Sequence, residues 1–173
     1  MIKARHLVTA RLVMSPVGGR DLPELVALKA DPRAYAQMLG GVRSAQRTAE
    51  ELAEEIQAWG EFGFGMWAVR ARDGHKLLGV TGLMHRPDGR GVALRFAFWP
   101  ASRGVGLASE AVHAALVYAH ETAGLEKIVA VAREDNFASR IVLGAIGMAE
   151  AERFIRDGVP LLVYQSVRHR NAG

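Results

Sequence analysis

The stretch FAFWPASRGVGLASEAVHAAL, residues 96–116, constrains the fold more than any other part of the sequence. An aromatic, strand-like run passes through a turn that contains Gly104, Gly106 and Ala108 and enters a segment of helical character. A turn needs one glycine at most, whereas several small residues at the start of a helix let a ligand approach the backbone N–H groups. The stretch therefore predicts a strand, an anion-binding turn and a helix, in that order.

The residues before this stretch predict one strand, helices and then more strands. Residues 6–16 alternate at period two and end at a proline, which is typical of a strand. Residues 21–30 and 48–59 predict helices, the first with Asp21 as its cap and the second opening on a Thr48 to Glu51 capping box. Three strand-like runs follow at 64–71, 76–85 and 92–100, and the turn signals between them predict an antiparallel meander.

The residues after the glycine turn predict a crossover and a final hairpin. A helix over about 107–121 ends with Gly124 as its C′ residue, and a buried strand follows at 127–132. Residues 136–147 predict a second helix, and residues 148–167 a hairpin that turns at Asp157 and Gly158.

This order predicts an α/β fold with a mixed central sheet, an antiparallel meander plus a strand–helix–strand crossover, flanked by helices. A chain of 173 residues normally forms one domain, and we expect a single domain over residues 1–173. A change of sheet direction tends to leave a cleft at the strand ends. We therefore expect a cleft between the fourth and fifth predicted strands, with the glycine turn facing it.

Composition excludes several classes of protein. The absence of cysteine excludes a disulfide framework, a thiolate metal site and a cysteine nucleophile, and is typical of a reducing cytosol. No apolar run approaches the roughly 18 residues of a membrane span, so we expect a soluble, cytoplasmic protein with no membrane partner. The net charge of +4 comes from arginines scattered singly along the chain, which disfavours nucleic acid and fits an anionic small molecule equally well.

Besides binding of an anionic small molecule in general, two specific interpretations of the glycine turn stay open. In a dinucleotide-binding fold, GVGLAS would supply the first two glycines of G-x-G-x-x-G, and Glu134 would bind a ribose. Against this, Ser109 stands at the third glycine, WPAS separates strand from turn, and only one crossover is predicted. The other alternative is a plain turn with no ligand.

Residues 103–108 resemble the R/Q-x-x-G-x-G/A pyrophosphate loop of the GNAT acyl-CoA N-acyltransferases. TARLVMSP, GFGMWAV, GVTGL, GVGLASEA and NFASRIVLGAIGM together resemble the ribosomal-protein N-terminal acetyltransferases (RimJ/RimL-like), in order and over nearly the whole chain. The resemblance implies a GNAT fold, acetyl-CoA as cosubstrate and transfer of an acetyl group to an amine.

The resemblance also implies roles for individual residues. A helix N-terminus binds a diphosphate through its N–H groups and the positive end of its dipole, and Arg103 can add a charged hydrogen bond. The pantetheine arm would pair with the strand FAF, where the Phe98 N–H would act as an oxyanion donor, and Ser139 would protonate the leaving thiolate. The expected cofactor-binding residues are Phe96, Ala97, Phe98, Arg103, Gly104, Val105, Gly106, Leu107, Ala108, Ser109, Asn136 and Ser139, with Phe98 and Ser139 catalytic.

Each of these roles has a structural alternative. Asn136 is an excellent N-cap and a serine is common in a first helical turn, so the spacing N-x-x-S alone favours capping over catalysis. The aromatic residues of FAF can pack in the core while their backbone contacts a ligand.

No general base is predicted. Ala93 stands where the family often carries a glutamate, and Arg95 replaces a glycine of that motif. His85 and Glu61 are the nearest substitutes, and neither is included in the site because a lone histidine at a strand end is usually solvated. The glutamates at 50, 51, 54 and 55 could attract a cationic acceptor or form a solvated helix face.

The sequence thus predicts an acetyl-CoA-dependent N-acetyltransferase that acts by direct attack and needs no metal. The favoured acceptor is a protein or peptide N-terminal α-amine. The alternatives are a small-molecule amine (an aminoglycoside, a polyamine or a metabolite) and a non-catalytic acyl-CoA-binding module. A homodimer is also left open.

Overall fold

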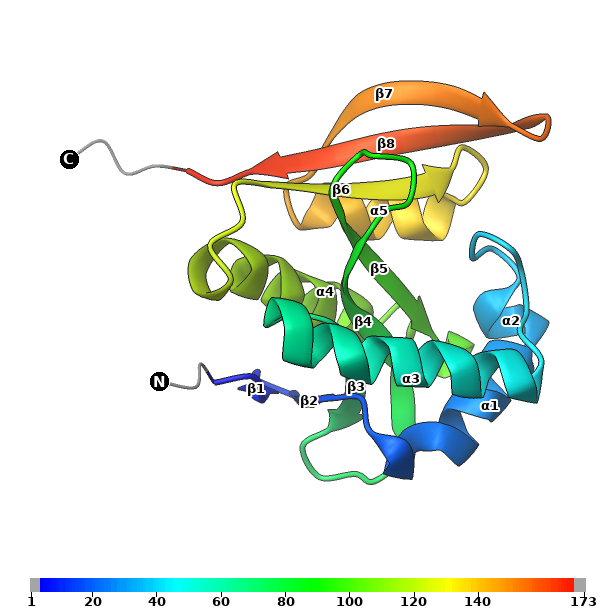
Figure 1. Ribbon diagram of the computed structural model, residues 1–173, viewed down its shortest axis with the longest axis vertical. Helices are drawn as coiled ribbons and strands as arrows, with labels where there is room; N and C mark the ends of the chain where they lie inside the picture. Colours follow the sequence, from blue (N-terminus) through cyan, green and yellow to red (C-terminus); the bar gives the residue numbers. More distant parts are fainter. Residues whose placement is uncertain (1–3, 170–173) are drawn as a thin grey trace.

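The computed structural model describes residues 4–169, and within them a single mixed sheet runs through the molecule (Figure 1). Its eight strands lie in the order β1-β2-β3-β4-β5-β6-β8-β7, and every neighbouring pair is antiparallel except β5 and β6, which are parallel. The predicted fold class is confirmed. The strands are β1 Leu7–Val8, β2 Leu12–Pro16, β3 Met66–Ala71, β4 Leu77–His85, β5 Val92–Phe98, β6 Lys127–Arg133, β7 Ala149–Arg156 and β8 Val159–Val167.

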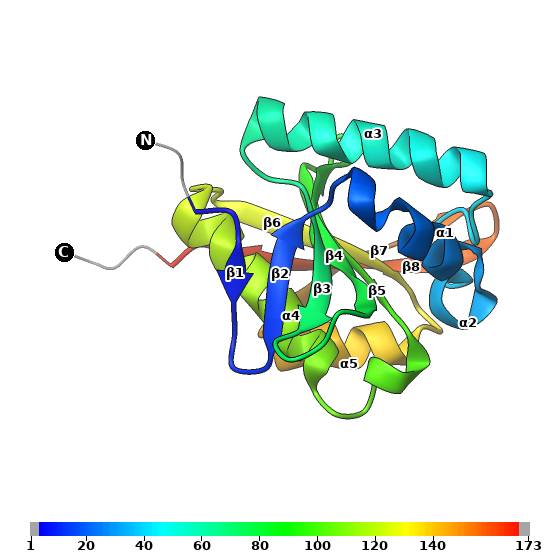
Figure 2. The same cartoon turned by 90° about the horizontal axis from the view of Figure 1, so that it is seen from below.

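Helices cover both faces of the sheet, as Figure 2 shows. On one face lie α1 Leu22–Ala30, α2 Pro32–Tyr35 and α3 Ala45–Phe62, after a short 3-10 turn at Gly19–Asp21. On the other face lie α4 Leu107–Val117, extended by a π turn at Tyr118–Thr122, and α5 Phe137–Ala145. A second 3-10 turn, Pro100–Ser102, joins β5 to the glycine turn.

Apolar side chains fill the space on both sides of the sheet. Leu25 of α1 and Leu52 of α3 pack with Ala97 of β5 on one side. Val112 of α4 and Leu143 of α5 belong to the larger cluster. These two layers hold β5 and β6 between rigid elements.

The first predicted strand is in fact a small hairpin. Residues 6–16 form β1 and β2 with a turn between them, in which the Thr9 N–H donates to the Leu12 carbonyl at 2.9 Å. The prediction of one strand was wrong because this turn is stabilised from outside: the Glu110 carboxylate of α4 accepts hydrogen bonds from the Thr9 hydroxyl and the Arg11 N–H.

The start of α3 also differs from the prediction. The N-cap is Ser44, whose hydroxyl accepts from the Arg47 N–H at 3.1 Å, and not Thr48. Thr48 is fully buried one turn into the helix and donates to the Ser44 carbonyl. The capping box was a misreading because Glu51 pairs with Arg43 instead.

Two predicted turns are confirmed by their backbone angles. Asp157 and Gly158 have φ values of 50° and 77°, the left-handed pair that a tight hairpin needs. Gly124 ends the α4 segment with φ of 71°.

Candidate active site

A cleft opens where β5 and β6 separate. β5 pairs with β4 over its whole length, but with β6 only at Ala93 and Val129. Beyond that pair, the part of β5 that runs toward Phe98 has no strand partner on the β6 side within the described residues. This is the predicted cleft, because β5 and β6 are the fourth and fifth strands of the sequence prediction.

The backbone of β5 presents two N–H groups on the side where β6 separates from it. The Trp99 N–H donates to the Leu78 carbonyl at 3.0 Å, and in an antiparallel ladder the hydrogen-bonded positions alternate along the strand. The N–H groups of Phe96 and Phe98 are therefore directed away from β4, toward the open edge. An extended ligand could pair with this edge as an added strand.

The side chains of the FAF segment are less accessible than its backbone. Ala97 and Phe98 are 5% and 3% exposed and belong to the two core clusters. Phe96 is half-buried and lines the cleft. Any contact of Ala97 and Phe98 with a ligand would therefore be through the backbone.

The glycine turn forms the N-terminus of α4. Gly104 and Gly106 have φ values of 77° and 80°, in the left-handed region that favours glycine, and Gly106 is the N-cap. No side chain in the described part of the chain caps this helix. Its first N–H groups are thus available to an anion.

The other predicted residues of the turn have mixed environments. Val105 is exposed, whereas Leu107 and Ala108 pack against the core and Ser109 is half-buried in the first helical turn. Arg103 is exposed, and its Nη2 donates to the carbonyls of Phe98 at 3.0 Å and Arg33 at 2.9 Å. Those bonds tie the turn to the end of β5 and leave other guanidinium N–H groups free for a ligand.

Arg11, which was not among the predicted site residues, forms a clamp that links this turn to α4. Arg11 donates from Nε to Glu110 Oε1 at 2.8 Å and from Nη1 to the Val105 carbonyl at 2.8 Å. Its Nη2 also lies 3.3 Å from the place where a Cβ of residue 106 would be. The clamp joins the first hairpin, the turn and α4, so it holds the turn in its present conformation.

The dependence of the protein's stability on pH in the acidic range should involve Glu110. Burial raises its pKa, but hydrogen bonds from Thr9 and Arg11 outweigh this and hold the pKa below the usual 4.5. A lowered pKa means that the stabilisation is present above pH 4.5 and is lost as pH falls through the folded-state value. We expect Glu110→Gln to lower the free energy of unfolding at pH 7 by about 1 kcal/mol, since Arg11 is half-exposed.

Urea unfolding between pH 3 and pH 7 measures this effect. The difference in the free energy of unfolding between Glu110→Gln and wild type should shrink below pH 4.5. The control is Glu121→Gln, at an exposed position after α4, which should show no such dependence on pH. If this difference in the free energy of unfolding is constant with pH, the ionised carboxylate of Glu110 is not its cause.

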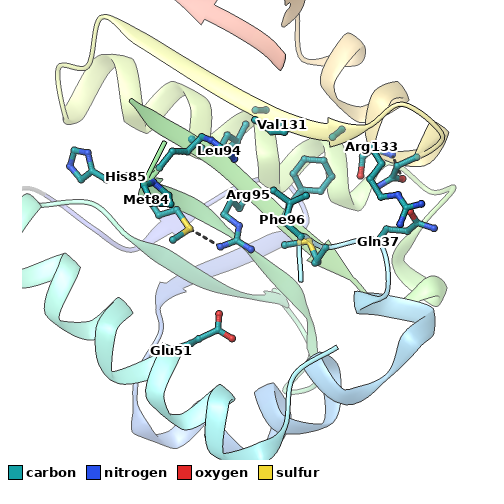
Figure 3. A pocket seen from close by; sticks show the side chains of 18 of the residues that line it. Gln37, Glu51, Met84, His85, Leu94, Arg95, Phe96, Val131 and Arg133 are labelled. Atoms are coloured by element: carbon teal, nitrogen blue, oxygen red, sulfur yellow. Dashed lines mark hydrogen bonds between the residues drawn. The ribbon is translucent and has the colours of Figure 1, made fainter. Parts of the chain in front are cut away.

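The cleft has a volume of about 300 Å³ and two halves (Figure 3). One half is formed by β5, β6 and the start of α5, and includes Phe96, Asn136 and Ser139. The other is formed by residues 37–39, the start of α3 and the end of β4. Of the predicted binding residues, these three line the cleft, and the glycine turn does not.

Asn136 and Ser139 fit both interpretations of the N-x-x-S spacing, which are helix capping and a position at the cleft. Asn136 is the N-cap of α5, and its Oδ1 accepts from the Ser139 backbone N–H at 3.3 Å. The half-buried Ser139 contributes only its backbone to the cap, and both residues line the cleft. The Ser139 hydroxyl is therefore not used by the cap.

The second half of the cleft contains carboxylates that already have cationic partners. Glu51 lies 3.0 Å from Arg43 and 4.0 Å from Lys29, and Glu54 lies 3.3 Å from Arg47. Behind them, burial raises the pKa of Glu55, although Lys29 opposes the shift.

The other positions considered for a base differ in their access to the cleft. Ala93, where an acid was expected, is buried and apolar. His85 lines the cleft, is exposed and packs edge-on against Phe62. Glu61 does not line it. Among residues 4–169, no group of three or more histidine, aspartate or glutamate side chains could hold a metal ion.

A parallel strand pair that separates, followed by a glycine-rich helix N-terminus, is the arrangement that the resemblance to the GNAT acyltransferases predicts. Residues 11–149 match the family model of the acetyltransferase (GNAT) domain, and the chain belongs to this family. It is an acyltransferase that uses acetyl-CoA.

Solved structures of the same fold agree with this assignment. An acetyltransferase from Agrobacterium tumefaciens str. C58 is 25% identical with a TM-score of 0.84, covering 97% of each chain. A GNAT-family acetyltransferase from Bordetella pertussis is 22% identical with a TM-score of 0.82, covering 96% of this chain and 100% of that one. A ribosomal L7/L12 α-N-protein acetyltransferase, RimL, solved with coenzyme A, is 15% identical with a TM-score of 0.75, covering 94% and 97%.

The described residues also bear on the membrane expectation. Between residues 4 and 169, no helix has the length and apolar character needed to cross a bilayer.

Proposed function

We propose that the chain is a single N-acetyltransferase domain, cytoplasmic and RimJ/RimL-like, that acetylates the α-amine of a protein or peptide N-terminus. The observation that supports this most is the separation of β5 from β6, which leaves an open edge on β5 and a cleft that Ser139 of α5 lines. The uncapped N-terminus of α4 follows β5 in the chain, although it does not line that cleft. The α-N-protein acetyltransferase with the same fold supports the choice of acceptor.

The first N–H groups of α4 and the glycine turn would bind the diphosphate of acetyl-CoA. Gly106 provides access, because any side chain there would occupy space near the helix end. The open edge of β5 at Phe96 and Phe98 would pair with the pantetheine amides, and Asn136 would contact the same arm. The remaining residues of this proposed site are Ala97, Arg103, Gly104, Val105, Leu107, Ala108 and Ser109.

Two groups would assist the transfer itself. Acetyl-CoA supplies an acetyl thioester, and the neutral amine attacks its carbonyl carbon as the C–S bond breaks. The Phe98 N–H would donate to the thioester oxygen as that oxygen gains negative charge. The Ser139 hydroxyl would give a proton to the leaving thiolate, and the proton that the attacking nitrogen loses, carried by solvent, would restore the hydroxyl. With no cysteine in the sequence, direct transfer without an acetyl-cysteine intermediate follows.

We expect α-amines to be better acceptors than polyamine or lysine ε-amines. We place the acceptor in the half of the cleft formed by residues 37–39, the start of α3 and the end of β4. No unpaired carboxylate of the described residues lines this half, so the enzyme depends on the fraction of acceptor that is already neutral. At pH 7.5 roughly a third of an α-amine with a pKa near 7.7 to 8.0 is neutral, against about 0.1% of an ε-amine near 10.4. The difference of about 2.6 units corresponds to roughly 3.5 kcal/mol.

The measurement is kcat/KM for a short peptide and for spermidine between pH 6 and pH 10. Activity should rise with pH and level off near the acceptor's own pKa, and neither His85→Ala nor Glu61→Gln should move the profile. Preference for spermidine at pH 7.5, or a plateau near pH 6.5 that disappears in either variant, would contradict the proposal.

One other function stays open: the acceptor is a small-molecule amine in place of a peptide N-terminus. Thiol release from acetyl-CoA, followed with Ellman's reagent over a panel of peptides, polyamines and aminoglycosides, separates these functions. Thiol release with a polyamine or an aminoglycoside and with no peptide would favour the small-molecule acceptor.

A further inference from the structure

Arg95 differs from every other arginine in the cleft. Five arginines that line it lie within 4 Å of an acidic side chain: Arg43 with Glu51, Arg47 with Glu54, Arg86 and Arg156 with Asp88, and Arg133 with Asp135. For Arg95, no carboxylate of the described residues lies within that distance. Its Nη1 contacts the Met84 sulfur at 2.7 Å, and a thioether is a weak acceptor.

The position of Arg95 on β5 exposes its charge to the cleft. Side chains alternate along a strand, so Arg95 shares a face with its neighbours Ala93 and Ala97, which are both small and buried. Figure 3 shows Arg95 in the middle of the cleft, with Glu51 on α3 on the opposite side. Arg95 as a whole is half-buried, its contact with Met84 is exposed, and it is adjacent in sequence to Phe96, whose N–H faces the open edge.

The carboxylates across the cleft have closer cationic partners than Arg95, although the charge of Arg95 acts on Glu55 at longer range and opposes the rise in its pKa. Glu51, Glu54 and Glu55 each lie within 4 Å of another cation, and none of them lies that close to Arg95. A guanidinium that contacts only a weak acceptor can still bind an anion, because its remaining N–H groups form a planar fork that matches a carboxylate.

We propose that Arg95 binds a carboxylate of the acceptor, so that the preferred acceptor is an α-amine with an acidic group beside it. A peptide that begins with aspartate and a free acidic amino acid both have this chemistry. The inference rests on the proposed function, since it specifies the acceptor that enters the same cleft.

Kinetics with acceptors of matched size and different charge test the inference. The peptides Asp-Ala-Ala-Ala-amide and Asn-Ala-Ala-Ala-amide differ only in the side-chain charge, and free aspartate distinguishes a small acidic acceptor from a peptide. In wild type, kcat/KM for the Asp peptide should exceed that for the Asn peptide by roughly 10-fold to 100-fold, the effect of one charge-assisted hydrogen bond or pair. In Arg95→Gln the ratio should fall to about one, and Arg95→Glu should invert it.

Arg47→Gln is the matched control, because it removes a charge from the same cleft that is already paired with Glu50 and Glu54. It should keep the wild-type ratio. Equal rates for the two peptides in wild type, or an acidic preference that survives in Arg95→Gln, would overturn the inference.

Binding measurements separate this inference from the proposed function. Calorimetric titration of the two peptides into the complex with coenzyme A reports the preference without turnover. An Arg95-dependent preference in binding with no acetylation of any amine would refute the proposed function alone. Acetylation of α-amines with no preference for the acidic peptide would refute the inference alone.

Discussion

Gly106→Glu is expected to abolish the binding of acetyl-CoA. Gly106 is the N-cap of α4, and a Cβ added there would lie 3.3 Å from Arg11 Nη2 and beside the first helical N–H groups. A glutamate side chain would occupy the space proposed for the diphosphate and would bring negative charge to it, whether or not it paired with Arg11. We expect a loss of affinity above about 100-fold, measured by calorimetry.

Backbone strain has to be separated from this effect. Gly106 has φ of 80°, so any other residue there costs roughly 1–2 kcal/mol. Gly124→Glu is the matched control, because Gly124 has φ of 71°, is exposed and has no atom near its missing Cβ. It should lose similar stability and keep its affinity. A folded Gly106→Glu protein with unchanged affinity for coenzyme A would remove the diphosphate assignment, and tighter binding of NAD by wild type would favour the dinucleotide alternative.

Ser139→Ala is expected to lower kcat by about 10²-fold while KM for acetyl-CoA changes little. This is the usual size of a general-acid contribution, and it would be confined to the step in which the thiolate leaves. Ser139 lines the cleft, whereas the cap uses only the Ser139 backbone N–H, which alanine retains. Steady-state kinetics with thermal unfolding of the same samples measure both quantities.

Asn136→Ala is the companion variant for the cap. It removes the side-chain acceptor of α5 and should cost about 1 kcal/mol of stability. If Ser139→Ala turns over acetyl-CoA at the wild-type rate, the serine has no part in the chemistry, and the N-x-x-S spacing reports capping alone.

Local patterns were sufficient for most of the fold. Period-two alternation located the meander, and apolar spacing with turn residues located the helices after it, because both depend on residues close together in the chain. The same holds for Gly106, Gly124 and Gly158, whose left-handed backbone angles are a preference of glycine itself. The order of elements then restricted the sheet to one with a single parallel pair.

Part of the candidate site was also readable in this way. The glycine turn and the N-x-x-S segment are short, and each follows a strand, so their places at the ends of β5 and β6 follow from topology. The presence of Arg95 in place of the glycine of the family motif could also be recognised from the sequence, but the role of Arg95 could not. Whether an arginine is paired depends on which carboxylates the fold brings near it.

The remaining features depend on contacts between distant segments. Glu110 holds the turn between β1 and β2 through bonds that span about 100 residues, which is why residues 6–16 resemble one strand in isolation. The same packing closes the cleft with α3 and leaves Arg95 without an acidic partner in the described structure. Local backbone preferences carry no information about such pairs, because the free energy of a long-range ion pair or hydrogen bond exists only once the sheet and its helices have brought the two side chains together.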